Sequence, residues 1–244
     1  MEGQLYGSAM KLDPNKNDLG GFTMSLIPAA TVMVMHPKDP APEFLVVHRN
    51  PDLPVQGNVW VFPGGRLAAT DTQNGANGNA LRACAVRETR EEAGLDLDPA
   101  KLIKVVRWET PEGIPKRFDA RFFLVPLAHK PVVQVDGREI VGYRWLTAEG
   151  ALRHHHQREI ELSAPGFVLL SWILSLGAAE KILSHFRQSP PLHVKPRLIQ
   201  LSDGRCNVYQ EDAAYESGDL MRSGPRHRLW MRESGWRYEG NPLA

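Results

Sequence analysis

Three glutamates and an arginine stand close together in one short segment of this 244-residue chain, and their side chains could hold a metal ion. Glu88, Glu91 and Glu92 are three and four positions apart, so on a helix they share one face. Like charges at that spacing repel each other, and the helix dipole disfavours anions in a last turn. A divalent cation would remove both penalties, and Mg²⁺ prefers carboxylate oxygens. The alternative is a solvated acidic helix end, in which Arg87 and Arg90 form surface ion pairs.

The elements that would position these carboxylates can be predicted from the surrounding residues. Residues 80–93 contain no Gly or Pro and are rich in Ala, Arg and Glu, which favours a helix, and Gly94 is a natural stop. Residues 59–62 (Val-Trp-Val-Phe) are typical of a short strand, which Pro63-Gly64-Gly65 ends. Glycines let a backbone come close to a ligand or metal. Residues 69–79 lack large apolar side chains and predict a loop.

This order of strand, Gly-Gly turn, loop and acidic helix resembles the Nudix box of the Nudix hydrolase superfamily. The usual form of that box is G-x5-E-x7-R-E-U-x-E-E-x-G-U, where U is apolar. Residues 87–95 (R-E-T-R-E-E-A-G-L) match its second half, with Thr89 at an apolar position.

The first half of the box departs from the usual pattern. Arg87 follows Gly65 by twenty-two positions instead of fourteen, so about eight residues are inserted. Counted back from Arg87, Asn79 replaces the first Glu of the box. Asp71 lies in the inserted loop and could replace the first Glu of the box, but this spacing does not support that role.

Flanking segments resemble a subgroup of long Nudix proteins that also carry an insertion in the box and include coenzyme A diphosphatases. The matching segments cover residues 60–66, 108–123 and 143–152. The more usual coenzyme A signature upstream of the box is not met, because the strand there ends in Val47-His48-Arg49. The resemblance therefore gives coenzyme A or an acyl-coenzyme A as one expected substrate class, beside ADP-ribose, NADH or a dinucleotide.

The resemblance implies hydrolysis of the pyrophosphate bond in a nucleoside diphosphate linked to another group. Mg²⁺ is the expected cofactor, with Mn²⁺ as the alternative, and its ligands would be Glu88, Glu91, Glu92 and the Gly65 carbonyl. Arg87 would pair with the box carboxylates and fix their rotamers. A different class of function is a non-catalytic nucleotide-binding regulator; the three retained glutamates argue against it.

Other candidate site residues lie outside the box. The general base is either a box glutamate such as Glu91 or Glu88, or Glu139 in a loop before a predicted strand. The candidates for substrate contact are Arg49, Arg117, Arg121 and Trp108. Arg117 and Arg121 are four positions apart, so on a strand they share one face. The run of three histidines at residues 154–156 cannot converge on one ion from a helix and is interpreted as a solvated cluster.

The remaining elements predict an α+β fold: a Nudix-type α/β/α sandwich with a mixed central sheet, C-terminal helices and a β-hairpin. Strands are expected at residues 29–35, 43–49, 102–108, 117–127 and 140–146, and Thr147 should cap a helix. A helix is expected at residues 166–186 and a hairpin around Ser234-Gly235. The expected organisation is a flexible arm at 1–22, a Nudix core at 23–160, and a packed C-terminal extension at 161–244.

Composition limits the partners. The chain has 29 Lys and Arg against 28 Asp and Glu, so no global field points to nucleic acid or to a membrane. Two cysteines form no metal-ligand spacing or disulfide framework, and the N-terminal residues lack an apolar signal region. We expect a cytoplasmic protein with a small-molecule nucleotide as its substrate; a homodimer stays open.

Overall fold

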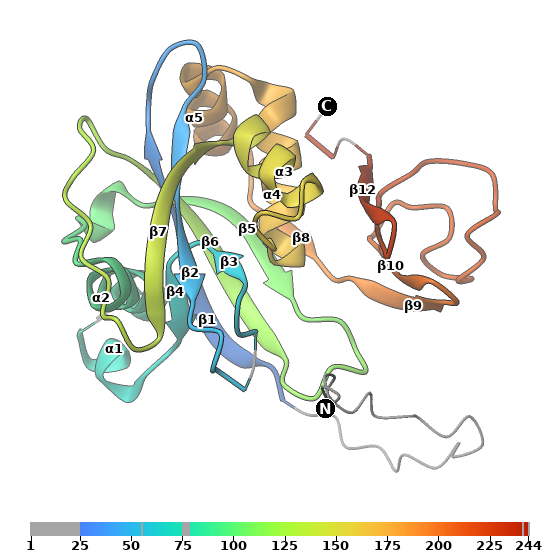
Figure 1. The fold of residues 1–244 in the computed structure, drawn as a ribbon, viewed down its shortest axis with the longest axis horizontal. Helices are drawn as coiled ribbons and strands as arrows, with labels where there is room; N and C mark the ends of the chain where they lie inside the picture. The colour runs from blue at the N-terminus through green and yellow to red at the C-terminus, as the bar shows by residue number, and fades with distance from the viewer. Residues whose placement is uncertain (1–24, 55, 75–78, 241, 244) are drawn as a thin grey trace, which may run out of the picture.

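The centre of the protein is a mixed eight-stranded sheet, described by a computed structural model that covers residues 25–54, 56–74, 79–240 and 242–243 (Figure 1). The central strands are buried in continuous runs, such as residues 32–35 and 44–47, and strands are present where residues 29–35, 43–49, 102–108, 117–127 and 140–146 predicted them. The strands are β1 (Ile27–His36), β2 (Glu43–Arg49), β3 (Trp60–Val61), β4 (Gly64–Arg66), β5 (Ile103–Glu109), β6 (Phe118–Pro126), β7 (Ile140–Thr147) and β8 (Leu192–Val194).

The sheet opens in its middle, and this opening positions the site. Strands β1 and β2 pair only at one end, where Met35 faces Phe44 and His36 faces Glu43. Beyond that point they diverge, and the gap is filled by β4 pairing with β1 and by β3 pairing with β2. The β3–β4 segment therefore crosses the gap and carries Pro63-Gly64-Gly65 through it. Strand β6 lies parallel to β1 and β8 parallel to β5; the other pairs are antiparallel.

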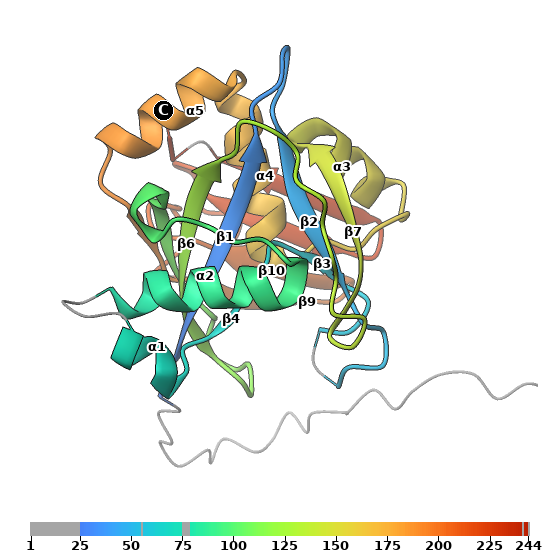
Figure 2. The ribbon, with the colours of Figure 1, turned by 90° about the vertical axis from the view of Figure 1, so that its left-hand side faces the viewer.

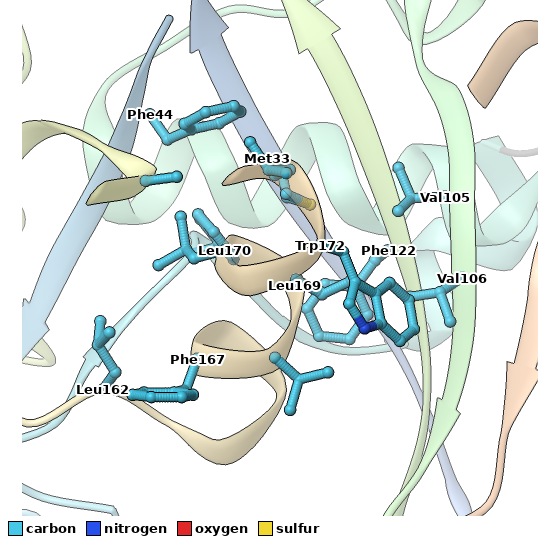
Figure 3. Close-up of a cluster of buried hydrophobic side chains, with 14 of the residues drawn as sticks. Met33, Phe44, Val105, Val106, Phe122, Leu162, Phe167, Leu169, Leu170 and Trp172 are labelled. Atoms are coloured by element: carbon cyan, nitrogen blue, oxygen red, sulfur yellow. The ribbon is translucent and has the colours of Figure 1, made fainter. Parts of the chain in front are cut away.

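Helices cover both faces of this sheet, as predicted. Figure 2 shows α2 lying across one face, and Cys84 and Ala85 of this helix belong to the apolar cluster there. On the other face, Figure 3 shows Leu169, Leu170 and Trp172 against Met33. The helices are α1 (Ala69–Asn74), α2 (Ala80–Ala93), η2 (Pro99–Lys101), α3 (Ala148–His156), α4 (Ala164–Leu176) and α5 (Ala179–Gln188).

The local signals at the ends of α2 and α3 act as predicted. Gly94 ends α2 in the left-handed conformation, with φ of 68°, and its N–H bonds to the Arg90 carbonyl. Thr147 caps α3 by accepting a hydrogen bond from Gly150 N. Thr89 occupies an apolar position of the box and is buried. Its hydroxyl tolerates burial because it donates to the Ala85 carbonyl at 2.7 Å.

Two predicted elements differ from the structure. The segment predicted as a loop at residues 69–79 contains α1. The backbone N–H of Ala68 donates to the Asp71 carboxylate and so stabilises the first turn of this helix. The single helix predicted at residues 166–186 is broken at Gly177, whose φ of 76° ends α4 before α5 begins. Among the described residues, no single helix is long and apolar enough to cross a membrane; α4 and α5, bent by 109°, satisfy the requirement only as a pair.

The C-terminal part forms a second, four-stranded antiparallel sheet. The predicted hairpin around Ser234-Gly235 is present as β11 and β12, and β9 and β10 extend it. The sheet packs on the core through Tyr209, Leu229 and Met231, and Trp172 Nε1 donates to the Tyr238 hydroxyl at 2.7 Å. Its strands are β9 (Arg197–Leu201), β10 (Gly204–Val208), β11 (Arg228–Arg232) and β12 (Gly235–Glu239). The predicted arm at 1–22 lies outside the described residues.

Candidate active site

Glu92 in the last turn of α2 is a buried acid held by the Gly-Gly turn. Its side chain is 4% exposed, and Oε2 accepts a hydrogen bond from Gly64 N at 2.8 Å. Burial raises the pKa of Glu92 to about 8, against the opposing effect of that hydrogen bond. Glu92 contacts no cation among residues 25–54, 56–74, 79–240 and 242–243, and a carboxylate with one backbone donor is costly to bury. The position therefore suits a group that would bring positive charge.

Glu88 lies one turn earlier, directly over Gly65. A Cβ atom at position 65 would lie 2.5 Å from Glu88 Cδ, so a larger residue there would displace this carboxylate. Burial is the largest influence on Glu88 and raises its pKa, while Arg87 opposes the rise. Gly65 pairs with Ala30 of β1, and its carbonyl also receives a weak contact from Cys84 Sγ at 3.6 Å. The β4 turn and α2 thus form a cradle lined with oxygen atoms.

Arg87 connects the carboxylates of this cradle to the preceding helix. Its Nε and Nη2 donate to the two oxygens of Asp71 at 2.8 and 2.9 Å. Nη2 also contacts Glu88 at 2.8 Å, and Nη1 contacts Glu91 at 2.8 Å. Burial by itself would raise the pKa of Asp71, which is 1% exposed, but the bonds from Arg87 and Ala68 bring it below its ordinary value. Arg87 is held in one orientation by a fork that a lysine could not form.

Asp71 takes the place beside Arg87 that spacing along the sequence had given to Asn79. The count back from Arg87 selected Asn79, which is exposed and forms no side-chain cap. The count forward from Gly65 gives six positions to Asp71, which is the G-x5-E spacing of the box. The insertion therefore follows the first acidic residue of the box, and counting forward would have found it.

A cavity of about 490 Å³ opens beside the cradle. One part of its wall is polar and includes Gly64, Gly65 and Glu88. Another part is apolar and aromatic, formed by Val61, Phe62, Trp108, Phe118, Phe122 and Pro165. The cavity can therefore take a ligand that joins a charged centre to an apolar or planar group.

Arg49 and Glu139 line the polar part of the cavity and pair with each other. Arg49 Nη1 donates to Glu139 Oε1 at 2.8 Å, and Arg49 Nε donates to the Gln56 carbonyl at 3.3 Å. Glu139 stays half-exposed and is close enough to raise the pKa of both Glu88 and Glu92 by its charge. The structure thus brings Arg49, Glu139 and Trp108, three residues singled out from the sequence, to one cavity.

Three other predicted residues lie away from the cavity wall. Arg117 donates to the Thr110 carbonyl at 3.1 Å, and Arg121 pairs with Asp119. The reason is the alternation of β6, which turns Ala120 and Phe122 toward the cavity and their neighbours away from it. Glu91 is the most exposed of the box carboxylates, with 58% of its side chain accessible, and it contacts Arg87.

The histidine run divides among separate partners. His154 contacts Glu159, His155 accepts from Leu162 N at 3.1 Å, and His156 contacts the Trp236 carbonyl at 3.1 Å. Within the described residues no group of three His, Cys, Asp or Glu side chains converges as a complete metal site. The cradle of Glu88, Glu92 and the Gly65 carbonyl nevertheless fits a hard cation, because it combines oxygen donors, buried charge and a backbone that approaches without a Cβ.

Comparisons with known proteins agree with this geometry. A family profile described as NUDIX domain matches residues 26–164, more than half of the chain. The acyl-coenzyme A diphosphatase NUDT19 of Homo sapiens is 40% identical over 122 residues, which are 48% of this chain and 32% of that protein. The protein of the same name from Xenopus laevis is 35% identical over 68 residues, 26% of this chain and 18% of that one. The chain thus matches about a third or less of the length of these relatives.

A solved structure supports the fold. The NUDIX hydrolase from Alicyclobacillus acidocaldarius superimposes with a TM-score of 0.61 and covers 69% of this chain and 100% of its own. Its sequence identity is 23%, so this likeness speaks for the fold alone.

Proposed function

Because this chain belongs to the Nudix family, we propose that it hydrolyses the pyrophosphate bond of a nucleoside diphosphate linked to another group. The observation that carries this proposal is the cradle in which Glu92 bonds to Gly64 N and Glu88 lies over Gly65. The cradle lies at the polar end of a cavity large enough for part of a nucleotide. The cradle contains more carboxylates than Arg87 can neutralise, so it suits a reaction on an anionic phosphate only if further positive charge joins it.

A divalent cation is the group that would bring this charge, and Nudix hydrolases generally use divalent metals. Glu88, Glu92 and the Gly65 carbonyl would hold Mg²⁺, or Mn²⁺ as the alternative, with Glu91 at the exposed edge. Such an ion neutralises phosphate oxygens and lowers the pKa of bound water. These residues contribute oxygen ligands of the kind that Mg²⁺ prefers.

The remaining polar residues have distinct tasks in the proposed reaction. Arg87 positions Glu88 and Glu91 and is itself fixed by Asp71. Arg49 faces the cavity and would contact a phosphate oxygen through its free donors. Glu139, next to Arg49, is the carboxylate best placed to take a proton from the attacking water, with Glu91 as the alternative base.

We further propose an acyl-coenzyme A as the substrate class. The apolar and aromatic wall around Phe62, Trp108 and Phe122 supports a substrate with a long apolar arm. The relatives named acyl-coenzyme A diphosphatases, 40% and 35% identical over 122 and 68 residues, support the same choice. ADP-ribose, NADH and dinucleotides share the diphosphate and are the competing substrates.

The test is a hydrolysis screen on the purified chain with Mg²⁺ and with Mn²⁺. The substrates are coenzyme A, an acyl-coenzyme A, ADP-ribose, NADH and a diadenosine polyphosphate, and released phosphate monoesters are measured. The expected result is metal-dependent turnover with the highest kcat/KM for the acyl-coenzyme A. Turnover of ADP-ribose alone would keep the reaction and overturn the substrate.

Matched variants separate an enzyme from a nucleotide-binding regulator. Glu91→Gln and Glu92→Gln remove charge at the cradle, whereas Arg90→Ala changes an exposed residue of the same helix that pairs with Asp96. We expect turnover to fall in the first two and to stay unchanged in the third. Full turnover in both glutamine variants would contradict the proposed site, and nucleotide binding without turnover in the parent chain would indicate a regulator.

A further inference from the structure

A second cavity, of about 570 Å³, lies on the other side of β3 from the candidate active site. Val61 and Phe62 face the first cavity, whereas Trp60 lines the second. The end of α3 and the β11–β12 turn line the second cavity from opposite sides. His156 Nε2 contacts the Trp236 carbonyl and Arg158 donates to the Glu233 carbonyl at 2.8 Å, so the two sides are joined. Its walls thus come from both the main sheet and the C-terminal sheet.

Three arginines from separate elements line this second cavity. Arg144 comes from β7, Arg158 from the segment after α3, and Arg232 from β11. Among the described residues, Arg144 has no hydrogen-bonded or ion-paired partner and rests with Cζ 4.9 Å from the centroid of the Trp60 ring. Stacking on an indole leaves the edge donors of a guanidinium free. Arg158 uses one donor on a carbonyl, and it contacts no carboxylate within the part of the chain that the structure describes.

The acidic residues of the same wall do not neutralise Arg144. Glu159 contacts His154, and Glu161 and Glu233 are exposed. Arg232 shares its charge with Asp203 at 3.2 Å in a pair that is 42% exposed on each side. The wall therefore carries three arginines and three glutamates, with the arginine donors only partly used. This balance suits a small anion with one phosphate better than a long polyanion such as nucleic acid.

Flat aromatic surfaces accompany the arginines. The His48 ring stacks on Trp60 with centroids 4.8 Å apart and planes at 4°, which, with Arg144, leaves Trp60 8% exposed. Trp236 is less covered and rests against His155, with ring centroids 4.6 Å apart. A planar ring of a ligand could extend this row of aromatic groups, because stacked and tilted aromatic pairs are favourable.

We propose that this second cavity binds a nucleoside monophosphate, with its phosphate at Arg144 and its base against Trp236. A guanidinium with unused donors selects phosphate by paired, charge-assisted hydrogen bonds. The Trp236 indole, which lines the same cavity, offers a face to a planar ring. The site is separate from the cradle of Glu88 and Glu92, so its ligand does not depend on the proposed hydrolysis.

The test is titration of the metal-free full chain with AMP in the presence of EDTA, followed by calorimetry, so that no turnover is needed. Arg144→Ala should weaken AMP binding by about tenfold or more, because a charge-assisted bond to phosphate is lost. Arg144→Lys should bind with intermediate affinity, since it keeps the charge and loses the fork. Arg90→Ala is the matched surface control, and Arg49→Ala changes the first cavity; neither should alter this affinity.

Two results would overturn the proposal. The first is AMP binding that is equally tight in Arg144→Ala and the parent chain, or that is lost in Arg49→Ala instead. The second is inorganic phosphate binding as tightly as AMP, which would leave no role for the ring. If Arg144→Ala does not fold by circular dichroism, Arg232→Ala replaces it, because its ion pair with Asp203 is half-exposed and its loss is tolerable.

Discussion

Arg87 and Arg228 each form a two-pronged ion pair with a buried aspartate, yet the two pairs have different surroundings. Arg228 and Asp212 are 1% and 0% exposed, and the remaining capacity of Asp212 is used by the backbone N–H groups of His227 and Ala214. Arg87 is a quarter exposed and contacts Glu88 and Glu91 in addition to Asp71. The C-terminal pair is saturated, whereas the site contains more carboxylate than its arginine can neutralise.

This difference indicates that Arg228 and Asp212 stabilise the fold, whereas Arg87 and its carboxylates belong to a binding site. A saturated buried pair stabilises the fold only while it is whole, because removal of one partner leaves an uncompensated charge. A surplus of carboxylates is a cost to the fold and is typical of a place that receives a cation. The C-terminal sheet should therefore respond to substitution in stability, and the box should respond in activity.

The largest effect is expected at Glu92, in the cradle that contains the surplus of carboxylates. Glu92→Gln keeps a hydrogen-bond acceptor for Gly64 N but removes the charge of a proposed metal ligand. We expect kcat/KM to fall about a thousandfold, roughly 4 kcal/mol, with the fold retained. Steady-state kinetics at saturating Mg²⁺ measures this, and circular dichroism checks the fold. A loss of less than about fivefold would place the reaction elsewhere.

A loss of stability of similar size is expected at the saturated pair. Asp212→Ala leaves Arg228 buried without its partner and should cost about 3–5 kcal/mol in the free energy of unfolding. Urea titration measures it, with Asp96→Ala as the control, because the Arg90–Asp96 pair is more than two-thirds exposed and should contribute less than about 1 kcal/mol. If both substitutions cost the same, the distinction between the two pairs fails.

A third prediction concerns a buried base near the C-terminal sheet. Burial lowers the pKa of His155 to about 4, and Nδ1 accepts from Leu162 N, so the ring is neutral in the fold. The unfolded chain protonates His155 near pH 6.5, so it binds more protons than the folded chain between pH 6.5 and 4. The stabilising contribution is therefore complete above pH 6.5 and is lost as the pH falls toward 4, by roughly 3 kcal/mol at most.

His155→Asn tests this pH dependence, because an amide oxygen can take the place of Nδ1 and does not titrate. The variant loses ring contacts and should be less stable at neutral pH, but its stability should fall less steeply between pH 6.5 and 4. His227, whose pKa burial also lowers, keeps part of the slope. His154→Asn, at a half-buried position that contacts Glu159, is the matched control. Equal slopes in His155→Asn and the parent chain would contradict the prediction.

The sequence predicted what local signals determine. The helix at Ala80–Ala93 and its end at Gly94 follow from propensity and a left-handed stop, and the strands follow from short apolar runs. The four-stranded C-terminal sheet was only partly visible, because the pairing of β10 with β11, such as Cys206 with Trp230, joins strands that are far apart in the sequence. The break at Gly177 was missed because apolar residues continue on both sides of it.

Site residues were predictable where their spacing along one helix determines which side chains lie together. They were less predictable where strand pairing determines which face meets the cavity. Glu88 and Glu92 share one face of α2, and the Gly-Gly turn at Gly64 and Gly65 packs against that face. Arg117 and Arg121 share a face as predicted, but which face of β6 meets the cavity depends on its pairing with β1 and β5. No pattern within β6 itself contains that information.

The smallest effect, and the one that decides between two interpretations of the box, is expected at Asp71. Asp71→Asn removes one of the three carboxylates that hold Arg87, and Glu88 and Glu91 remain. Because Asp71 acts through Arg87, kcat/KM should fall about 10–100-fold, with KM for the metal rising alongside. Asp71→Glu should retain more activity than Asp71→Asn.

Adding Asn79→Glu to Asp71→Asn should restore nothing, because residue 79 is exposed at the start of α2 and does not reach Arg87 in the fold. Rescue by Asn79→Glu would mean that the count back from Arg87 is the right one, and that the insertion precedes the first acidic position of the box.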